Sequence, residues 1–479
     1  MRARARLTFT AGLVLALLCT AVTVARPQGP RGNTADCPPN QLCLRYDQPD
    51  RLGRTVDPAD YPYRFREPYL ATITAGALNP DGLTPGITRE VVGVPGLPGR
   101  DRLPMLEGRN AVNVALYRQR GPAPLVFILG GMGSNPFFGL GTYYAGLFHQ
   151  AGAHVIVLPS PMTWNFAQAA SRSGVPGYTP DDARDLYRLM QETLAHLRAR
   201  HGLQVTGIDF LGASLGALEG AYLSVLDAHE RKLDIQHFLL LNPPLDLTYA
   251  MDRLDEWQAL GAGFGRERAA AVALKSRGIV EDYVEDRRKN PNTTFERAIR
   301  EFSRFSTEEL QYGIAQYMRL VLPELVYVTQ AIDDQGVLTA PRNQGRQRLL
   351  EARAFTLKDY EERIAVPRRQ RVELGADGEA LNQRGSLWRI LDHVRDNPRV
   401  HIMHNADDPL VERGKLEELK QIMGDRMTLY PYGGHLGNLW YGPNQEDILR
   451  FFGAPDMRTV RPSAPAGSPP RLSRSVEPR

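Results

Sequence analysis

Short apolar runs alternate with longer amphipathic stretches through the middle of the chain. The runs are bounded by Gly and Pro, which is typical of strands that are buried on both faces of a sheet. They lie at residues 113–117, 125–129, 154–158, 205–211 and 238–241. Between them, the segment 180–200 places Leu186, Leu189 and Leu197 on one stripe at helical spacing. This alternation predicts an α/β fold, with a mostly parallel sheet and helices on both of its faces.

The alternation stops near Leu247 and resumes at residues 400–403 and 427–430. The intervening segment is charged and mainly helical in pattern, and residues 307–332 form its clearest helix. A helical block inserted between two strands of one sheet is expected to cap the carboxyl edge, where open α/β sheets bind ligands. The alternative is a separate helical domain with no role at the site.

The N-terminus has the layout of a secretory signal. Arg2, Arg4 and Arg6 precede an apolar run over residues 7–25, which ends in small residues suited to cleavage. We therefore expect an exported protein, either periplasmic or secreted. An uncleaved run would instead anchor the chain, because its length approaches that of a minimal membrane span.

Cys37 and Cys43 are the two cysteines that remain after the signal. An even pair in an oxidising compartment predicts a small disulfide loop near the mature N-terminus. The alternative is two free thiols. No Cys-X-X-Cys or Cys/His spacing typical of a metal site is present in the sequence, so no metal is predicted.

The segment 26–108 is rich in Pro, Gly, Asp and Arg, and residues 69–74 suggest a short extended piece. The end of the chain is rich in Pro, Ser and Arg and is expected to be disordered. The predicted division is a signal peptide (1–25), an N-terminal extension (26–108), an α/β core (109–247 and 396–456), a helical cap insertion (248–395) and a tail (457–479).

Composition and charge narrow the function classes. The chain of 479 residues is 42% hydrophobic and 23% charged, which excludes a polytopic membrane protein, a collagen-like fibre and a wholly disordered chain. The formal net charge is +4, but arginines at the two ends carry it, so the part between them is slightly acidic. A nucleic-acid partner therefore has no electrostatic support.

The chemistry centres on Gly212-Ala213-Ser214-Leu215-Gly216, between the apolar run that ends at Leu211 and a helical stretch. A serine at such a turn needs strained backbone angles that expose its hydroxyl. Side chains two residues before and after it would collide, which explains both glycines. The helix N-terminus also directs N–H groups toward developing negative charge. The motif therefore predicts Ser214 as a nucleophile.

A second glycine-rich turn, Gly130–Ser134, follows the run 125–129. We expect the backbone N–H groups of Met132 and Leu215 to form an oxyanion hole. The alternatives are a plain tight turn or a phosphate cradle, although a phosphate loop would favour a Lys where Asn135 and Pro136 follow.

A serine hydroxyl needs a base, and the base needs an orienting carboxylate. His435 follows the last predicted strand within Gly433–Gly437, and the glycines would let this loop carry an imidazole over the sheet. The preceding strand is followed by Asp407 and Asp408, either of which could orient it. We favour Asp408, with Asp407 closing the turn and Asp246 as a third option. The order Ser214, Asp408, His435 is the order of the α/β-hydrolase triad.

The segments 125–134, 210–220, 404–411 and 433–437 resemble the α/β-hydrolase superfamily, and the last two are most similar to its esterase and acylglycerol-lipase-like branch. The resemblance covers about residues 110–247 and 400–452. It implies an α/β-hydrolase fold with Ser214 as nucleophile, Asp408 as orienting acid and His435 as base. The chain departs at Gly130, where many members carry His.

These patterns predict an exported serine hydrolase that cleaves a small-molecule or lipid carboxylic ester through an acyl-enzyme. No metal or organic cofactor is expected, and an N-terminal anchor or peripheral membrane contact would fit the leader. The alternatives are an amidase or peptidase with the same triad, or a non-catalytic binding protein on the same fold. The sequence does not indicate acyl chain length or oligomeric state.

Overall fold

The computed structural model describes residues 52–78, 87–100, 111–290, 293, 295–373 and 377–453. The signal segment 1–25, the disulfide between Cys37 and Cys43, and the tail 457–479 lie outside the described residues. Export, membrane anchoring and the disulfide therefore stay predictions.

An eight-stranded sheet forms the centre of the described part, in the order β1-β2-β4-β3-β5-β6-β7-β8. Strand β2 is antiparallel to β1 and β4, and the strands from β4 to β8 run parallel. The strands are β1 (Arg89–Pro95), β2 (Ala111–Tyr117), β3 (Ala123–Leu129), β4 (His154–Leu158), β5 (Val205–Ala213), β6 (His237–Leu241), β7 (Val400–Asn405) and β8 (Met427–Tyr430). The predicted mostly parallel α/β sheet is confirmed.

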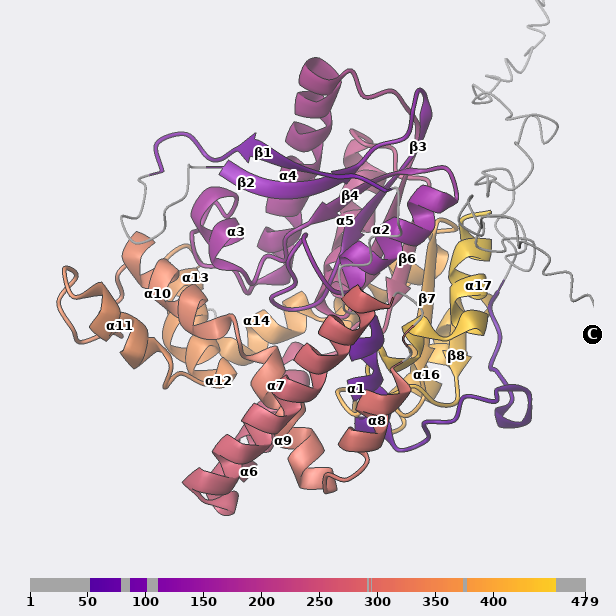
Figure 1. The fold of residues 1–479 in the computed structure, drawn as a ribbon. Coiled ribbons are helices and arrows are strands. Elements are labelled where there is room, and N and C mark those ends of the chain that lie inside the picture. The colour runs from indigo at the N-terminus through magenta and orange to yellow at the C-terminus, as the bar shows by residue number, and fades with distance from the viewer. Residues whose placement is uncertain are drawn as a thin grey trace, which may run out of the picture. The chain divides into compact units, whose positions relative to one another are not determined.

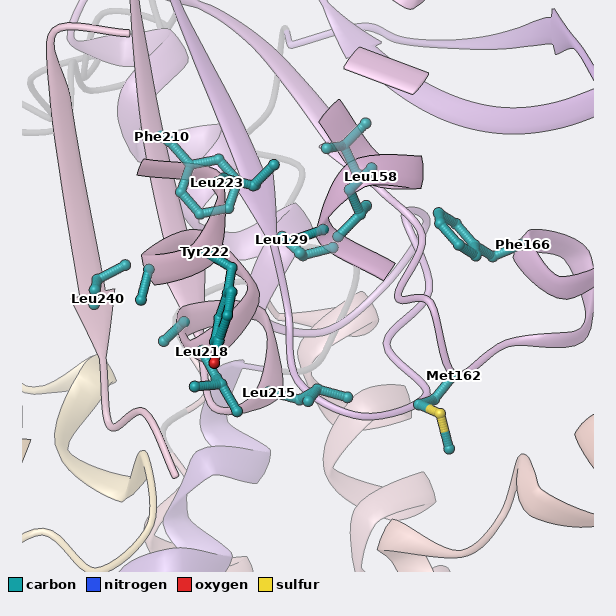
Figure 2. Close-up of a cluster of buried hydrophobic side chains, with 14 of the residues drawn as sticks. Leu129, Leu158, Met162, Phe166, Phe210, Leu215, Leu218, Tyr222, Leu223 and Leu240 are labelled. Atoms are coloured by element: carbon teal, nitrogen blue, oxygen red, sulfur yellow. The ribbon is translucent and has the colours of Figure 1, made fainter. Parts of the chain in front are cut away.

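Successive side chains of the inner strands enter two different hydrophobic clusters. Phe210 and Leu240 belong to one cluster, and their neighbours Leu211 and Leu239 belong to the other. Because side chains alternate along a strand, this division shows that both faces of the sheet are buried. Figure 2 shows the first cluster, in which Leu218 and other side chains of α5 lie beside the strands.

Helices outside the insertion cover the two faces and the ends of the sheet (Figure 1). Helix α5 contacts β5 and β6, whereas α2 contacts β3 and β4. They are α1 (Pro68–Ile73), α2 (Leu140–Gln150), α3 (Trp164–Ala169), α4 (Thr179–His201), α5 (Leu215–Glu230), α15 (Leu391–Asp396), α16 (Lys415–Met423) and α17 (Gly442–Phe451). The short 3₁₀ turns are η2 (Pro58–Asp60), η3 (Thr74–Leu78), η5 (Leu387–Ile390), η6 (Gly424–Arg426) and η7 (Gly437–Trp440).

The chain between β6 and β7 is helical, and we call α6 to α14 the inserted helices. They are α6 (Leu247–Phe264), α7 (Arg266–Lys289), α8 (Glu296–Phe302), α9 (Thr307–Met318), α10 (Leu322–Ile332), α11 (Gly345–Ala352), α12 (Leu357–Tyr360), α13 (Val366–Gln370) and α14 (Gly378–Gly385), with a π-helical turn, η4 (Glu361–Ala365), after α12. Within the described ranges, no helix has the length and apolar character needed to cross a membrane.

The single helix predicted over residues 307–332 is wrong, because the structure divides it into α9 and α10. Pro323 lies in the first turn of α10. Proline has no backbone N–H and its ring clashes with the carbonyl group four residues earlier, so a helix restarts there instead of continuing.

The extended piece predicted at residues 69–74 is also wrong, because α1 and η3 occupy this segment. Glu67 caps α1 by accepting the N–H of Leu70, and Pro68 occupies the first turn, where proline is favoured. The extension predicted for residues 26–108 also contains β1, which pairs with β2 at the edge of the sheet.

Candidate active site

Ser214 stands at the sharp turn between β5 and α5, as the motif predicts. Its backbone has φ 54° and ψ −125°, a conformation that non-glycine residues rarely adopt. The Ser214 N–H donates to the carbonyl oxygen of Leu241 on β6 at 2.8 Å, which holds the strained turn against the sheet. This arrangement places the serine at the carboxyl end of the parallel strands.

The two motif glycines are required by close backbone contacts. A Cβ at Gly212 would lie 2.2 Å from the carbonyl oxygen of Gly216. A Cβ at Gly216 would lie 2.4 Å from the carbonyl oxygens of Gly130 and Leu129. Neither backbone can yield without disturbing β3 or the turn itself, so the predicted collision is a property of the folded chain.

Replacing Gly216 by alanine is expected to lower the free energy of unfolding by about 1–3 kcal/mol, the range typical of overpacking. Helix propensity alone would predict the opposite sign, because alanine is favoured over glycine within a helix by about 1 kcal/mol. Gly278→Ala in the middle of α7 is the matched control, since a Cβ there meets nothing within 4 Å. Urea unfolding should show a lower free energy of unfolding for Gly216→Ala and a higher one for Gly278→Ala. Equal changes in the two variants would contradict the steric explanation.

The glycine-rich turn after β3 lies directly against the serine. A Cβ on Gly131 would stand 2.9 Å from Cβ and 3.3 Å from Oγ of Ser214. Within the described part of the chain, the backbone N–H groups of Met132 and Leu215 donate to no residue. Both predicted donors of an oxyanion hole are therefore available near the serine.

His435 lies on the loop after β8, and this loop rests on α1. The His435 N–H donates to Oγ1 of Thr72 at 2.9 Å. Cβ atoms at Gly434 and Gly437 would lie 2.2 Å and 1.8 Å from the carbonyl oxygens of Pro68 and Ala71. The glycines therefore allow the loop to approach the α1 backbone closely, and that approach holds the imidazole in place.

The three predicted residues Ser214, His435 and Asp408 meet in one chain of hydrogen bonds. Nε2 of His435 lies 2.8 Å from Oγ of Ser214, and Nδ1 lies 2.9 Å from Oδ2 of Asp408. Since a carboxylate can only accept, Nδ1 holds the ring proton and Nε2 is free to accept the serine proton. The arrangement can generate a serine alkoxide as the hydroxyl attacks.

Asp408 is fully buried and yet held in its charged form. Burial would raise the pKa of its carboxyl group, but the imidazole of His435 and the amide of Asn242 hold that pKa below its usual value. Asn242 donates to Oδ2 at 2.9 Å, and the Leu410 N–H donates to Oδ1 at 3.0 Å. Both oxygens are thereby occupied, which fixes the carboxylate toward the imidazole.

The other two acidic candidates, Asp407 and Asp246, form hydrogen bonds elsewhere. Asp407 accepts the Gly434 N–H at 2.8 Å and so fastens the histidine loop, consistent with its predicted turn role. Asp246 accepts the N–H of Tyr249 at the start of α6 and the side-chain amide of Asn382. Of the three acids, Asp408 is the one hydrogen-bonded to the imidazole of His435.

Two further buried histidines stay neutral. Burial lowers the pKa of His401 to about 3, and its Nε2 hydrogen-bonds with Oγ1 of Thr428 on the neighbouring strand. Burial also lowers the pKa of His404, whose Nδ1 accepts the Asn405 N–H at 3.0 Å. His404 Nε2 lies 3.2 Å from the Pro243 carbonyl oxygen, so it carries the proton. Neither ring contacts Ser214.

Asp407 should make stability depend on pH, because burial raises the pKa of its carboxyl group from 3.8 to about 6. Folding then favours the protonated form, so stability present below about pH 4 is lost as the pH rises through 6. Asp407→Asn should remove this loss. Between pH 4 and 7 its free energy of unfolding should rise by about 1–2 kcal/mol relative to that of the parent, because partial exposure to solvent weakens the full effect of the pKa shift. Urea unfolding of the parent and the variant at pH 4 and at pH 7 measures this difference in stability.

Asp392→Asn is the control for this pH effect, because that carboxylate is 89% exposed. Its stability should follow that of the parent at both pH values. A parallel shift of the Asp407 and Asp392 variants would show that general charge, not the buried carboxyl group, sets the dependence.

A cavity of about 120 Å³ opens beside the serine. Ser214, His435, Met132 and Leu215 line one part of it, and residues of α6, α9, η4 and α14 are among those that line other parts. The inserted helices therefore contribute directly to the wall of the site. Their apolar contributions include Met251, Leu254, Met318 and Leu381.

Sequence reasoning missed Thr72 and Asn242, which hold the histidine backbone and the aspartate. Thr72 lies 363 residues before His435, and Asn242 lies 166 residues before Asp408, so no local motif reveals either contact. The only available signal for Asn242 is its place directly after β6, beside the strand that leads to Asp408.

No protein-family model and no curated protein matches this chain. Among solved structures, a brefeldin A esterase, described as a bacterial homologue of human hormone-sensitive lipase, is 15% identical, with 82% of this chain and 88% of that chain covered and a TM-score of 0.38. An esterase of Pyrobaculum calidifontis is 13% identical (80% and 89% covered, TM-score 0.36). Carboxyl esterase 2 from the fungus Tuber melanosporum is 15% identical (79% and 88% covered, TM-score 0.35).

At such low identities and TM-scores, these likenesses do not indicate an activity. The topology of the chain itself identifies the fold. The eight-stranded, mostly parallel sheet places a strained serine between β5 and α5. The acidic residue follows β7 and the histidine follows β8, in the chain order that distinguishes this scaffold from other triad folds. The chain has the α/β-hydrolase fold.

Proposed function

We propose that this protein is a serine hydrolase that cleaves carboxylic esters through a covalent acyl-enzyme. The observation that carries the proposal is the continuous chain of hydrogen bonds from Ser214 Oγ through His435 to Asp408, at 2.8 and 2.9 Å. A serine hydroxyl, an imidazole and a buried carboxylate in this order form the relay that activates a serine nucleophile.

In the first half of the reaction, Oγ of Ser214 attacks the carbonyl carbon of the ester while Nε2 of His435 takes the hydroxyl proton. Asp408 stabilises the imidazolium that forms. The N–H groups of Met132 and Leu215 would bind the oxyanion of the tetrahedral intermediate, and they lie on the two backbone segments that meet at the serine. His435 then returns the proton to the leaving alcohol.

In the second half, water enters the cavity beside His435. Nε2 accepts a proton from this water, whose oxygen attacks the acyl carbon, and a second oxyanion forms in the same hole. Collapse of that intermediate releases the carboxylic acid and returns the proton to Ser214. Apart from the substrate and this water, the groups used in these steps belong to the residues already described.

The proposal is tested by labelling and by turnover on matched substrates. A fluorophosphonate probe should label the purified protein at Ser214, as located by peptide mass spectrometry. A panel of p-nitrophenyl esters and the corresponding p-nitroanilides of the same acyl groups should show faster turnover of the esters.

Faster turnover of the anilides would replace the ester assignment by an amidase. Absence of both labelling and turnover would indicate a binding protein on the hydrolase scaffold and would refute the proposal.

A further inference from the structure

The cavity has an acidic end that the proposed chemistry leaves unused. Glu219, Asp182 and Thr179 line it, with exposures of 1%, 3% and 2%. Oε2 of Glu219 and Oγ1 of Thr179 are buried and have no hydrogen-bond partner. Buried polar atoms in folded proteins are nearly always paired, so two such atoms in one cavity wall favour a ligand that donates hydrogen bonds.

Helix α5 sets the distance between this acidic end and the nucleophile. Leu215 and Glu219 are four residues apart, so they lie on one face of the helix and both line the cavity. Four residues of α-helix rise about 6 Å. A ligand group that reaches the Glu219 carboxylate therefore lies a few bonds away from a carbonyl carbon held at Ser214.

The residues that the structure describes pair no cation with Glu219 or Asp182. Among the described residues, no arginine or lysine forms an ion pair with Glu219 or Asp182; Asp182 accepts the Gly177 N–H at 2.6 Å. Arg369 also lines the cavity, but its guanidinium binds Asp181 and Glu373.

The other titratable groups in the wall do not neutralise the acids. Glu361 adds a third carboxyl group, and its Oε1 accepts a hydrogen bond from the hydroxyl of Thr248 at 3.5 Å. Tyr360 donates its hydroxyl to the carbonyl oxygen of Pro176, and Arg369 stacks over the ring of Tyr178. The titratable side chains of the wall are therefore three acids, two tyrosines, His435 and Arg369, whose charge is already paired. The part of the cavity lined by Glu219 and Asp182 is acidic.

Burial raises the pKa of both Glu219 and Asp182 well above the usual carboxyl range, and the nearby Asp182 raises that of Glu219 further. The charged forms are therefore costly in these buried positions. A positively charged group placed between them would reverse this cost, because an opposite charge within hydrogen-bonding distance favours the carboxylate.

We infer that the acidic end of the cavity binds a positively charged amino group carried by the substrate, so that amino esters are the preferred substrates. This inference rests on the proposed ester hydrolysis at Ser214. The ammonium donates to the carboxylates of Glu219 and Asp182, and the apolar side chains of the cavity wall contact the intervening methylene groups.

Two matched ester pairs test the inference at pH 7. The pair p-nitrophenyl 6-aminohexanoate and p-nitrophenyl heptanoate places the charge on the acyl part. The pair 5-aminopentyl acetate and hexyl acetate places it on the alcohol part. In each pair a methyl group replaces the ammonium. The parent protein should favour the amino ester of at least one pair by about 10–100-fold in kcat/KM, the range of a charged hydrogen bond.

Glu219→Gln removes the charge and keeps the shape, so it should bring this ratio close to one while turnover of the neutral ester is retained. Asp182→Asn, which keeps an oxygen for the Gly177 N–H, should lower the ratio in the same way and serves if the first variant does not fold. Asp185→Asn is the matched control: this acid is buried one turn further along α4 but does not line the cavity, so the ratio should be unchanged.

Turnover of the neutral esters with no preference for either amino ester would overturn the inference and leave the proposed function standing. So would a preference that persists in both the Glu219 and Asp182 variants. If no ester is turned over and the fluorophosphonate does not label Ser214, the proposed function fails and the inference fails with it.

Discussion

Ser214→Ala is expected to lower kcat for ester hydrolysis by on the order of 10⁶-fold, the loss typical of removing the nucleophile of a serine relay. Among the described residues, the Ser214 hydroxyl is the group that hydrogen-bonds with His435 Nε2, at 2.8 Å. Without it no acyl-enzyme can form, and the remaining rate would come from oxyanion binding and from water. Steady-state kinetics on a p-nitrophenyl ester, with titration of active sites by the phosphonate, measures the loss.

Ser224→Ala provides the matched control for this variant. Ser224 is a buried serine of the same helix α5, and its hydroxyl donates to the carbonyl oxygen of Ala221 at 2.7 Å, away from the cavity. It should keep parental kcat. An Ser214 variant with near-parental turnover and an unchanged melting temperature would remove the basis of the proposed function.

Asp408→Asn should lower kcat by on the order of 10⁴-fold, the effect of losing the carboxylate in a triad. An asparagine can present its NH₂ group to Nδ1, which then favours the tautomer with the proton on Nε2, the nitrogen that must accept from Ser214. The variant also faces the donating amide of Asn242, which lies 2.9 Å from Oδ2 in the parent. The phosphonate labelling rate should fall in parallel with kcat.

The neighbouring Asp407→Asn variant separates a specific carboxylate effect from a general one. Asp407 accepts a backbone N–H of Gly434 at 2.8 Å, and asparagine keeps an oxygen for that bond. Most of the activity should therefore remain. A larger kcat loss for the Asp407 variant than for the Asp408 variant would exchange the roles of the two acids.

The parallel part of the sheet could be predicted because each of its strands is a local apolar run. His154–Leu158 and Met427–Tyr430 begin and end where the pattern placed them. Strand β1 was missed because Gly93 and Pro95 interrupt its short apolar alternation, and such residues are tolerated at a sheet edge. The N-terminal residues of α1 were misread because Pro68 indicates a turn as readily as a helix start.

The hydrogen-bonded meeting of Ser214, His435 and Asp408 could be predicted because the α/β-hydrolase order ties each residue to the end of a particular strand. Residues that act through tertiary contacts could not be. Glu219 looks like an ordinary charge on a helix, and only tertiary packing, including that of α4 against α5, turns it into a buried carboxyl group. Neither its lack of a partner nor its place in the cavity wall follows from local spacing.

The contact between α1 and the histidine loop has a practical consequence for anyone who shortens the protein. Chain boundaries drawn around the sheet alone would start near Arg89 and discard Thr72, together with the backbone carbonyl groups against which Gly434 and Gly437 lie. Every strand would remain after such a cut, but His435 would lose the contacts that position it. An expressed fragment should therefore begin ahead of Leu52. In a crystal structure of a protein shortened to Arg89, we expect His435 to be displaced from the position described here.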